Sequence, residues 1–83
     1  MISEIKKVNI KKQIELNHLI INLKNGEKFA SAFIFDSIDL YNQFFWALGI
    51  NVDDFRNDNY YFDKARNIHI SESLDGYVWI STV

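Results

Sequence analysis

Residues 37–48 carry the clearest structural signal in the chain. Their apolar side chains recur at helical spacing and, at about 100° per residue, form one broad face. That face consists of Ile38, Tyr41, Phe44, Phe45 and Leu48, extended by Leu40 and Ala47. Asp36 stands where it can cap the N-terminus, and Gly49 stands where a helix ends in the left-handed conformation. We therefore predict an amphipathic helix, which has to bury its apolar face against a second layer.

The C-terminal third predicts short strands. Asp75–Gly76 is a two-residue turn signal between β-forming segments. Such a turn pairs Glu72 with Trp79 and Ile70 with Ser81, which puts a mostly apolar set on one face. Residues 60–63 are expected to form another short strand. Residues 50–59 are expected to form a polar, acidic loop or a single helical turn.

A further hairpin is predicted at residues 18–35, because Asn25–Gly26 separates two apolar segments. We favour a three-residue loop with Gly26 in the left-handed conformation over a two-residue loop. The longer loop places one apolar set on a single side, namely Leu19, Ile21, Leu23, Phe29, Phe33 and Phe35. Residues 2–16 fit both periods, and we favour a strand from about residue 8 to residue 16.

Together these elements predict an α+β fold, with an antiparallel sheet of about four or five strands packed on one amphipathic helix. The 83 residues suffice for a single domain, residues 1–83, in which residues 1–7 are expected to fray. Hydrophobic residues make up 48% of the chain and aromatic residues 16%, which compensates for the limited burial available to a small domain. The same aromatic content favours a partner or a homodimer.

Composition also indicates the cellular compartment in which the protein is expected. The chain has no cysteine, which excludes a disulfide framework and thiolate metal sites. No apolar run reaches the roughly 18 residues of a membrane span, and the N-terminal residues lack the apolar core of a signal peptide. We expect a cytoplasmic protein of a bacterial or phage-infected cell.

Catalytic machinery is not indicated. His18 and His69 lie far apart in sequence, and no nucleophile–base motif or phosphate loop accompanies them. The aspartates after residue 50 lack the spacing and the glycine of a calcium loop. We therefore expect no catalytic residues, no cofactor, no metal and no enzymatic activity.

Clustered aspartates suggest binding instead. Residues 36–63 hold six aspartates against one arginine, Arg56. They indicate either a solvated segment that aids solubility or an acidic surface that engages a basic partner. Trp46 falls in the polar arc of the predicted helix, where it is either covered by a neighbouring segment or free to anchor a partner. The predicted partner-binding residues are Asp39, Trp46, Asp53, Asp54, Phe55, Asp58 and Tyr60.

Two alternatives remain open. A homodimeric or assembly module would use a sheet edge or the surplus of aromatic side chains. A nucleic-acid-binding accessory protein would use Lys6, Lys7, Lys11 and Lys12. Direct nucleic-acid binding is the weaker of the two, because the sequence shows no interleaving of basic and aromatic residues.

Residues 19–63 also resemble a known family. The matching positions are Asn22, Leu23, Gly26, Glu27, Phe33, Phe35, Ile38, Asp39, Gly49, Ile50, Asn51, Tyr61 and Asp63. In this order they resemble the first segment of ArdA-type antirestriction proteins, which imitate DNA. The family is longer and strongly acidic, whereas this chain has a net charge of −2 and lysines near its N-terminus. The resemblance implies a small phage-encoded or mobile-element inhibitor of a host nucleic-acid-handling enzyme involved in defence.

Overall fold

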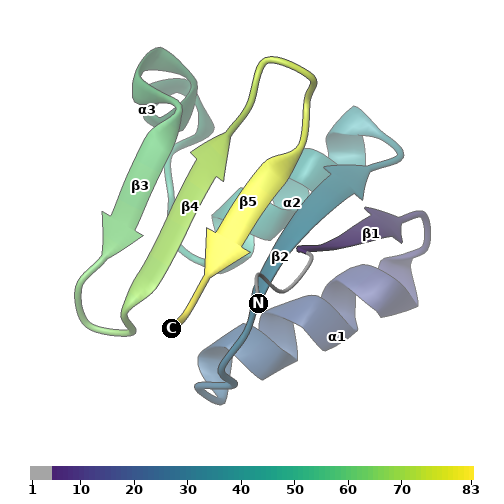
Figure 1. Ribbon diagram of the computed structural model, residues 1–83. Coiled ribbons are helices and arrows are strands. Elements are labelled where there is room, and N and C mark those ends of the chain that lie inside the picture. Colours follow the sequence, from purple (N-terminus) through teal and green to yellow (C-terminus); the bar gives the residue numbers. More distant parts are fainter. Residues whose placement is uncertain (1–4) are drawn as a thin grey trace.

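The computed structural model describes residues 5–83 and has an α+β fold with three helices and a five-stranded mixed sheet (Figure 1). In chain order the elements are β1 (Lys6–Ile10), α1 (Gln13–Lys24), β2 (Ala30–Phe35), α2 (Ile38–Ala47), α3 (Val52–Asp58), β3 (Tyr60–Asp63), β4 (Ile68–Glu72) and β5 (Val78–Ser81). The predicted fold class is confirmed.

The sheet has the strand order β1-β2-β5-β4-β3 (Figure 1). Strands β2, β5, β4 and β3 pair antiparallel, but β1 and β2 are parallel. The prediction of a purely antiparallel sheet was therefore wrong. A parallel neighbour requires a crossover connection, and α1 supplies it.

Helix α1 occupies the segment in which the hairpin predicted over residues 18–35 had its first strand. Its buried side chains recur at helical spacing, and they are Leu16, Leu19 and Leu23. Ile21, which the hairpin would have buried with them, is 56% exposed. Asn25 instead ends the helix, and Gly26 follows it with φ of 79°. A left-handed glycine serves a helix end as well as a tight turn, which is why the turn signal was misleading.

The start of α1 is fixed by Glu15. Its carboxylate accepts hydrogen bonds from the backbone N–H groups of Lys11 and Lys12, both at 2.9 Å. These bonds stabilise the charged carboxylate and lower the pKa of Glu15. The predicted strand over residues 8–16 thus gives way to β1 followed by a capped helix. Residues 6 and 7 belong to β1 and are not frayed, and residues 1–4 lie outside the described part of the chain.

Helix α2 confirms the strongest prediction. Four of the expected apolar positions in the helix, and Leu48 beyond it, are buried; the four are Leu40, Tyr41, Phe44 and Phe45. Two details differ. Ser37, rather than Asp36, is the N-cap, and its Oγ accepts from the backbone N–H of Leu40 at 3.2 Å. Ile38, in the first turn, remains 60% exposed.

Helix α3 occupies the segment for which a loop or a single turn was expected. Asn51 caps it, since its Oδ1 accepts from the backbone N–H of Asp54 at 3.0 Å. Asn59 ends it in the left-handed conformation, with φ of 54°. Strand β3 then follows at once, as predicted.

The β4–β5 hairpin is confirmed, but its predicted register was wrong by one residue. Ile70 pairs with Ile80, and Glu72 pairs with Val78. The backbone N–H of Gly76 donates to the carbonyl of Ser73 at 3.0 Å, and Gly76 has φ of 89°, which lengthens the loop to three residues. The shift buries Val78 and Ile80 in place of Trp79, because a one-residue slip exchanges the two faces of a strand.

One face of the sheet holds the core. The strands contribute Ile10, Phe33, Ile68, Ile70, Val78 and Ile80 to a single buried cluster. The same cluster contains the buried side chains of α1, α2 and α3, so all three helices cover this face. No described element covers the opposite face, which makes the molecule two layers thick.

Thr82 ties the end of β5 to the segment before β2. The residue is 3% exposed, and its hydroxyl accepts from the backbone N–H of Phe29 at 2.9 Å and donates to the carbonyl of Glu27 at 2.6 Å. Thr82→Val removes the hydroxyl, so the N–H of Phe29 and the carbonyl of Glu27 lose this hydrogen-bond partner. We expect the free energy of unfolding in urea to fall by about 1–2 kcal/mol. The control is Ser81→Ala, because the more exposed Ser81 hydroxyl has only one contact, at 3.5 Å. Equal losses in both variants would contradict this role.

Candidate functional site

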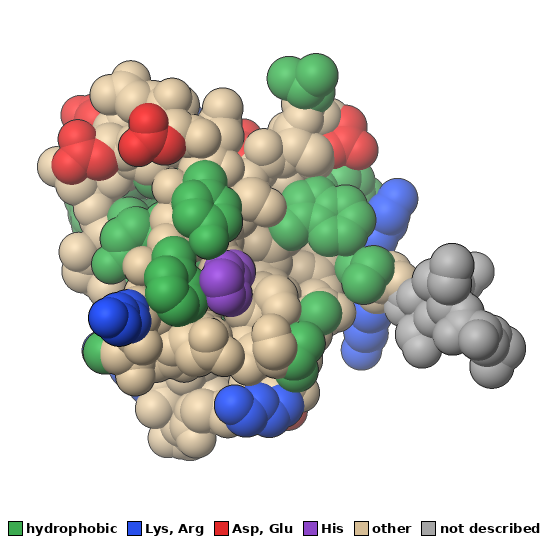
Figure 2. All heavy atoms as spheres, turned by 60° about the vertical axis from the view of Figure 1, so that its left-hand side comes forward, with side chains coloured by type: hydrophobic (Ala, Val, Ile, Leu, Met, Phe, Trp, Pro, Cys, Tyr) green, Lys and Arg blue, Asp and Glu red, His purple; other side chains and the backbone are tan. Residues whose placement is uncertain are grey.

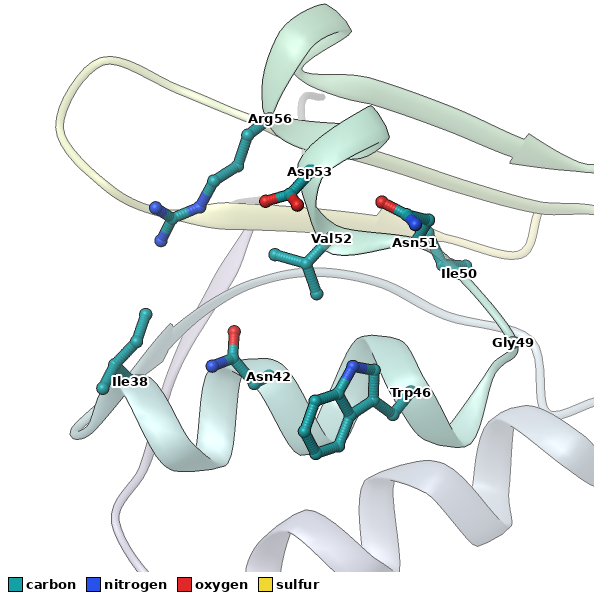
Figure 3. Close-up of a pocket in the computed structure, with 9 residues that line it drawn as sticks. All are labelled: Ile38, Asn42, Trp46, Gly49, Ile50, Asn51, Val52, Asp53 and Arg56. Carbon is teal, nitrogen blue, oxygen red and sulfur yellow. The ribbon is translucent and has the colours of Figure 1, made fainter.

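A groove of about 640 Å³ runs between α2 and α3 (Figure 3). Helix α2 contributes Ile38, Asn42 and Trp46 to one wall. The start of α3 contributes Val52 and Asp53 to the other, and Arg56 lies beyond them. The two helices contact each other through their buried faces, where the rings of Phe45 and Phe55 pack, and the groove lies between their outer sides.

Trp46 is the most exposed aromatic side chain in the described part of the chain, at 69%. The buried residues of α2 point into the core, and Trp46 lies on the opposite arc. Within residues 5–83 neither the acidic segment nor the N-terminal strand covers it. Solvent exposure of a large apolar ring has a free-energy cost that burial in a complex would recover.

The aspartates of α3 are exposed and lack basic partners. Asp53, Asp54 and Asp58 all lie at the surface. The one ion pair within residues 5–83 joins Arg66 to Asp63, at 2.8 Å. The charge of α3 is therefore not neutralised by salt bridges within this part of the chain.

The structure brings only some of the predicted residues together. Trp46 and Asp53 lie in the same groove (Figure 3). Asp54, Asp58 and Tyr60 line a separate, smaller hollow of about 280 Å³, and Phe55 forms part of its wall. Asp39 accepts a hydrogen bond from Nε2 of Gln43 at 2.8 Å and does not line the groove.

Two of the predicted aromatic residues, Phe55 and Tyr60, do not line the groove. Phe55 is 2% exposed, and its ring centroid lies 4.5 Å from that of Phe45. Phe55 therefore belongs to the core, and its ring is not exposed to a partner. Tyr60 is 50% exposed, but its hydroxyl lies 3.0 Å from Nδ1 of His69 on the open face of the sheet. It belongs to a different surface from Trp46.

Sequence reasoning missed that second surface. Tyr60 and Phe62 alternate in β3, and Trp79 occupies the corresponding face of β5. The signal was present as aromatic residues two positions apart, which share one face of a strand. It was hidden because the predicted register placed Trp79 with the core.

Other chemistry is limited. Among residues 5–83 there is no group of three or more histidine, aspartate or glutamate side chains able to share a metal ion. His18 is exposed on α1, whereas His69 lies on β4. No helix in the described part of the chain has the length and apolar character needed to span a membrane.

The chain matches no protein-family model, no curated protein and no solved structure in comparisons with known proteins. The groove and the open sheet face therefore have to be interpreted from their own geometry.

Proposed function

We propose that this protein is a non-enzymatic binding protein whose α2–α3 groove docks onto a basic surface of a protein partner. The observation that carries the proposal is the exposed indole of Trp46 on one wall of the groove and the unpaired carboxylate of Asp53 on the other. An exposed aromatic anchor bordered by charge is typical of protein interfaces.

The partner we propose is a host enzyme that handles nucleic acid, such as a defence nuclease in a bacterial or phage-infected cell. Such enzymes carry basic surfaces for phosphate groups, and an acidic protein can occupy them. The resemblance of residues 19–63 to antirestriction proteins points in the same direction. The protein would then act as an inhibitor by covering the enzyme's substrate surface.

Arg56 limits how acidic the groove can be. Its guanidinium lies 5.1 Å from the ring centroid of Tyr41, at the end of the groove away from Trp46. A partner that reaches both ends would need a basic group opposite Asp53 and a neutral or acidic group opposite Arg56. This arrangement supports recognition of one orientation rather than a uniform attraction to basic proteins.

Two variants test the groove. Trp46→Ser should weaken partner binding about 30-fold, as loss of a central aromatic contact does. Asp53→Lys should weaken it about tenfold, because it reverses a charge that faces a basic surface. The measurement is quantitative recovery of proteins from infected-cell extract on immobilised protein, followed by titration of the purified partner.

The chain offers matched controls for both changes. Ile21→Ser removes an exposed apolar side chain from α1, and Glu27→Lys reverses an exposed charge before β2. Asp53 lies in the first turn of α3, where a lysine opposes the helix dipole. Thermal unfolding must therefore show that Asp53→Lys is folded. A partner retained equally by all four variants would rule out the groove.

A further inference from the structure

The open face of the sheet carries an ordered row of side chains across all five strands. The strand register aligns Tyr60, Ser71, Trp79, Ala32 and Lys7, in that order, from β3 to β1. Because alternate residues of a strand point to opposite faces, all five point away from the helices. Along this row the side chains are, in turn, aromatic, small, aromatic, small and cationic.

A second aromatic pair lies next to this row. The rings of Phe62 and His69 are stacked, with centroids 4.3 Å apart and planes 23° apart. The hydroxyl oxygen of Tyr60 lies 3.0 Å from Nδ1 of His69, within hydrogen-bond distance. Tyr60 is 50% exposed and Phe62 is 40% exposed. The pair is therefore pre-ordered by contacts within the chain while ring surface remains open to solvent.

Charge is distributed unevenly over the molecule. Within residues 5–83 no carboxylate occupies a strand position that points to the open face. Asp63 and Glu72 are the acidic residues in strands, and they occupy the helix side, where Glu72 accepts from the Tyr41 hydroxyl. Lys7 lies on the open face, with Nζ 5.0 Å from the ring centroid of Tyr77.

Figure 2 shows the same separation, with a histidine among hydrophobic side chains, Lys and Arg side chains towards the borders, and acidic side chains along the upper edge. The strand positions of this face carry no carboxylate, and the acidic residues lie at its border, where Asp54 and Asp58 line a hollow with Tyr60 and the charge of Asp75 acts on Lys7.

We propose that the open sheet face binds single-stranded nucleic acid, with bases stacking on Tyr60, Phe62 and Trp79 and a phosphate contacting Lys7. The exposed rings of Tyr60 and Phe62, the partly exposed ring of Trp79 and the ammonium group of Lys7 provide what unpaired bases and their anionic backbone require. This binding is separate from the α2–α3 groove and does not rest on the function proposed for it.

A second copy of the chain fits this face less well. Five strands about 4.8 Å apart and about 16 Å long cover a projected area of roughly 400 Å². A stable interface usually takes about 800 Å² from each partner. The area is sufficient for a few stacked bases but small for a dimer.

The two tryptophans allow a direct test. In a Trp46→Phe background Trp79 is the only tryptophan, so its fluorescence reports on the open face. Titration at low salt with an oligothymidylate of about ten nucleotides should quench this fluorescence to saturation. A duplex of the same length should bind more weakly, because its base faces are not accessible.

Variants locate the binding. Phe62→Ala and Tyr60→Ala should each weaken oligothymidylate binding about fivefold or more. Lys7→Ala should weaken it several-fold and reduce the slope of log affinity against log salt by about 0.7. Ile21→Ala, on exposed α1, should bind as the parent does. Trp46→Ser, used in place of Trp46→Phe, should also bind as the parent does, and because it changes no charge it separates this surface from the proposed protein-binding groove.

Three results would overturn the proposal. The first is no quenching of Trp79 at low salt. The second is an affinity of Phe62→Ala and Tyr60→Ala equal to that of Ile21→Ala, with all three variants folded. The third is a dimer in sedimentation that Phe62→Ala dissociates, which would assign the face to a second copy.

Discussion

Replacing Phe45 with alanine is expected to lower the free energy of unfolding by about 3–5 kcal/mol, the largest effect of any single change considered for this protein. Phe45 is fully buried, at 0% exposure. Its ring centroid lies 4.9 Å from that of Tyr41, 5.1 Å from that of Phe44 and 4.5 Å from that of Phe55. It therefore joins α2 to α3, and its removal leaves a cavity that both helices line.

Urea denaturation followed by circular dichroism measures this loss. Phe62→Ala is the matched control, because it removes the same ring from a position that is 40% exposed. Small domains have a total stability of about 5–15 kcal/mol, so Phe45→Ala should unfold at a much lower urea concentration than the wild-type protein. Similar midpoints for the two variants would mean that α3 does not depend on Phe45.

The second large effect concerns alkaline pH. Burial, together with the hydrogen bond that the Tyr41 hydroxyl donates to Oε1 of Glu72 at 2.7 Å, raises the pKa of Tyr41 to about 12. In the unfolded chain the pKa is near its ordinary value of about 10. The folded state therefore holds this proton more tightly. The resulting stabilisation is fully present below about pH 10 and is lost as pH rises towards 12.

The comparison with Tyr41→Phe isolates this contribution. Between about pH 9 and pH 12 the wild-type protein should lose on the order of 2–3 kcal/mol more unfolding free energy than the variant does. Lysines and the other tyrosines titrate in both proteins, so the difference reports Tyr41 alone. Parallel stability curves would show that the tyrosine ionises as easily in the folded protein as in the unfolded chain.

Local signals predicted part of the fold. Helix α2 was identified because its apolar period, its polar arc and its C-terminal Gly49 all agree. Strand β3 and the β4–β5 hairpin were identified from β-forming residues and Asp75–Gly76. The register of that hairpin was not, because both a two-residue and a three-residue loop are compatible with this dipeptide and only packing decides between them.

The N-terminal third shows where local signals are insufficient. In residues 13–24 apolar side chains recur both at helical spacing, as Leu16, Leu19 and Leu23 do, and at alternate positions, as Leu19, Ile21 and Leu23 do. Burial decides between the two periods, and burial depends on β2 and α2, which come later in the chain. The parallel pairing of β1 likewise follows only once residues 13–24 form a crossover helix.

The candidate surfaces were predicted in part. The helical pattern placed Trp46 in the polar arc of the helix but left open whether a neighbouring segment covers it, and composition singled out the aspartates of residues 50–59. The burial of Phe55 did not, because a short segment does not reveal which side of a seven-residue helix meets the core. The open sheet face required the full register, since its aromatic residues come from strands that are separated in sequence.

The position of β5 has a consequence for synthesis on the ribosome. This strand is the last element of the domain in chain order, yet it lies between β2 and β4 (Figure 1). Until Val78–Ser81 has emerged, β1 and β2 can pair through α1, and β3 can pair with β4, but the two halves of the sheet share no strand. Each half then exposes an unpaired edge that another nascent chain can occupy. Productive folding of this domain is therefore expected to follow release of β5, and slow elongation just before it would extend the interval in which chains can associate wrongly.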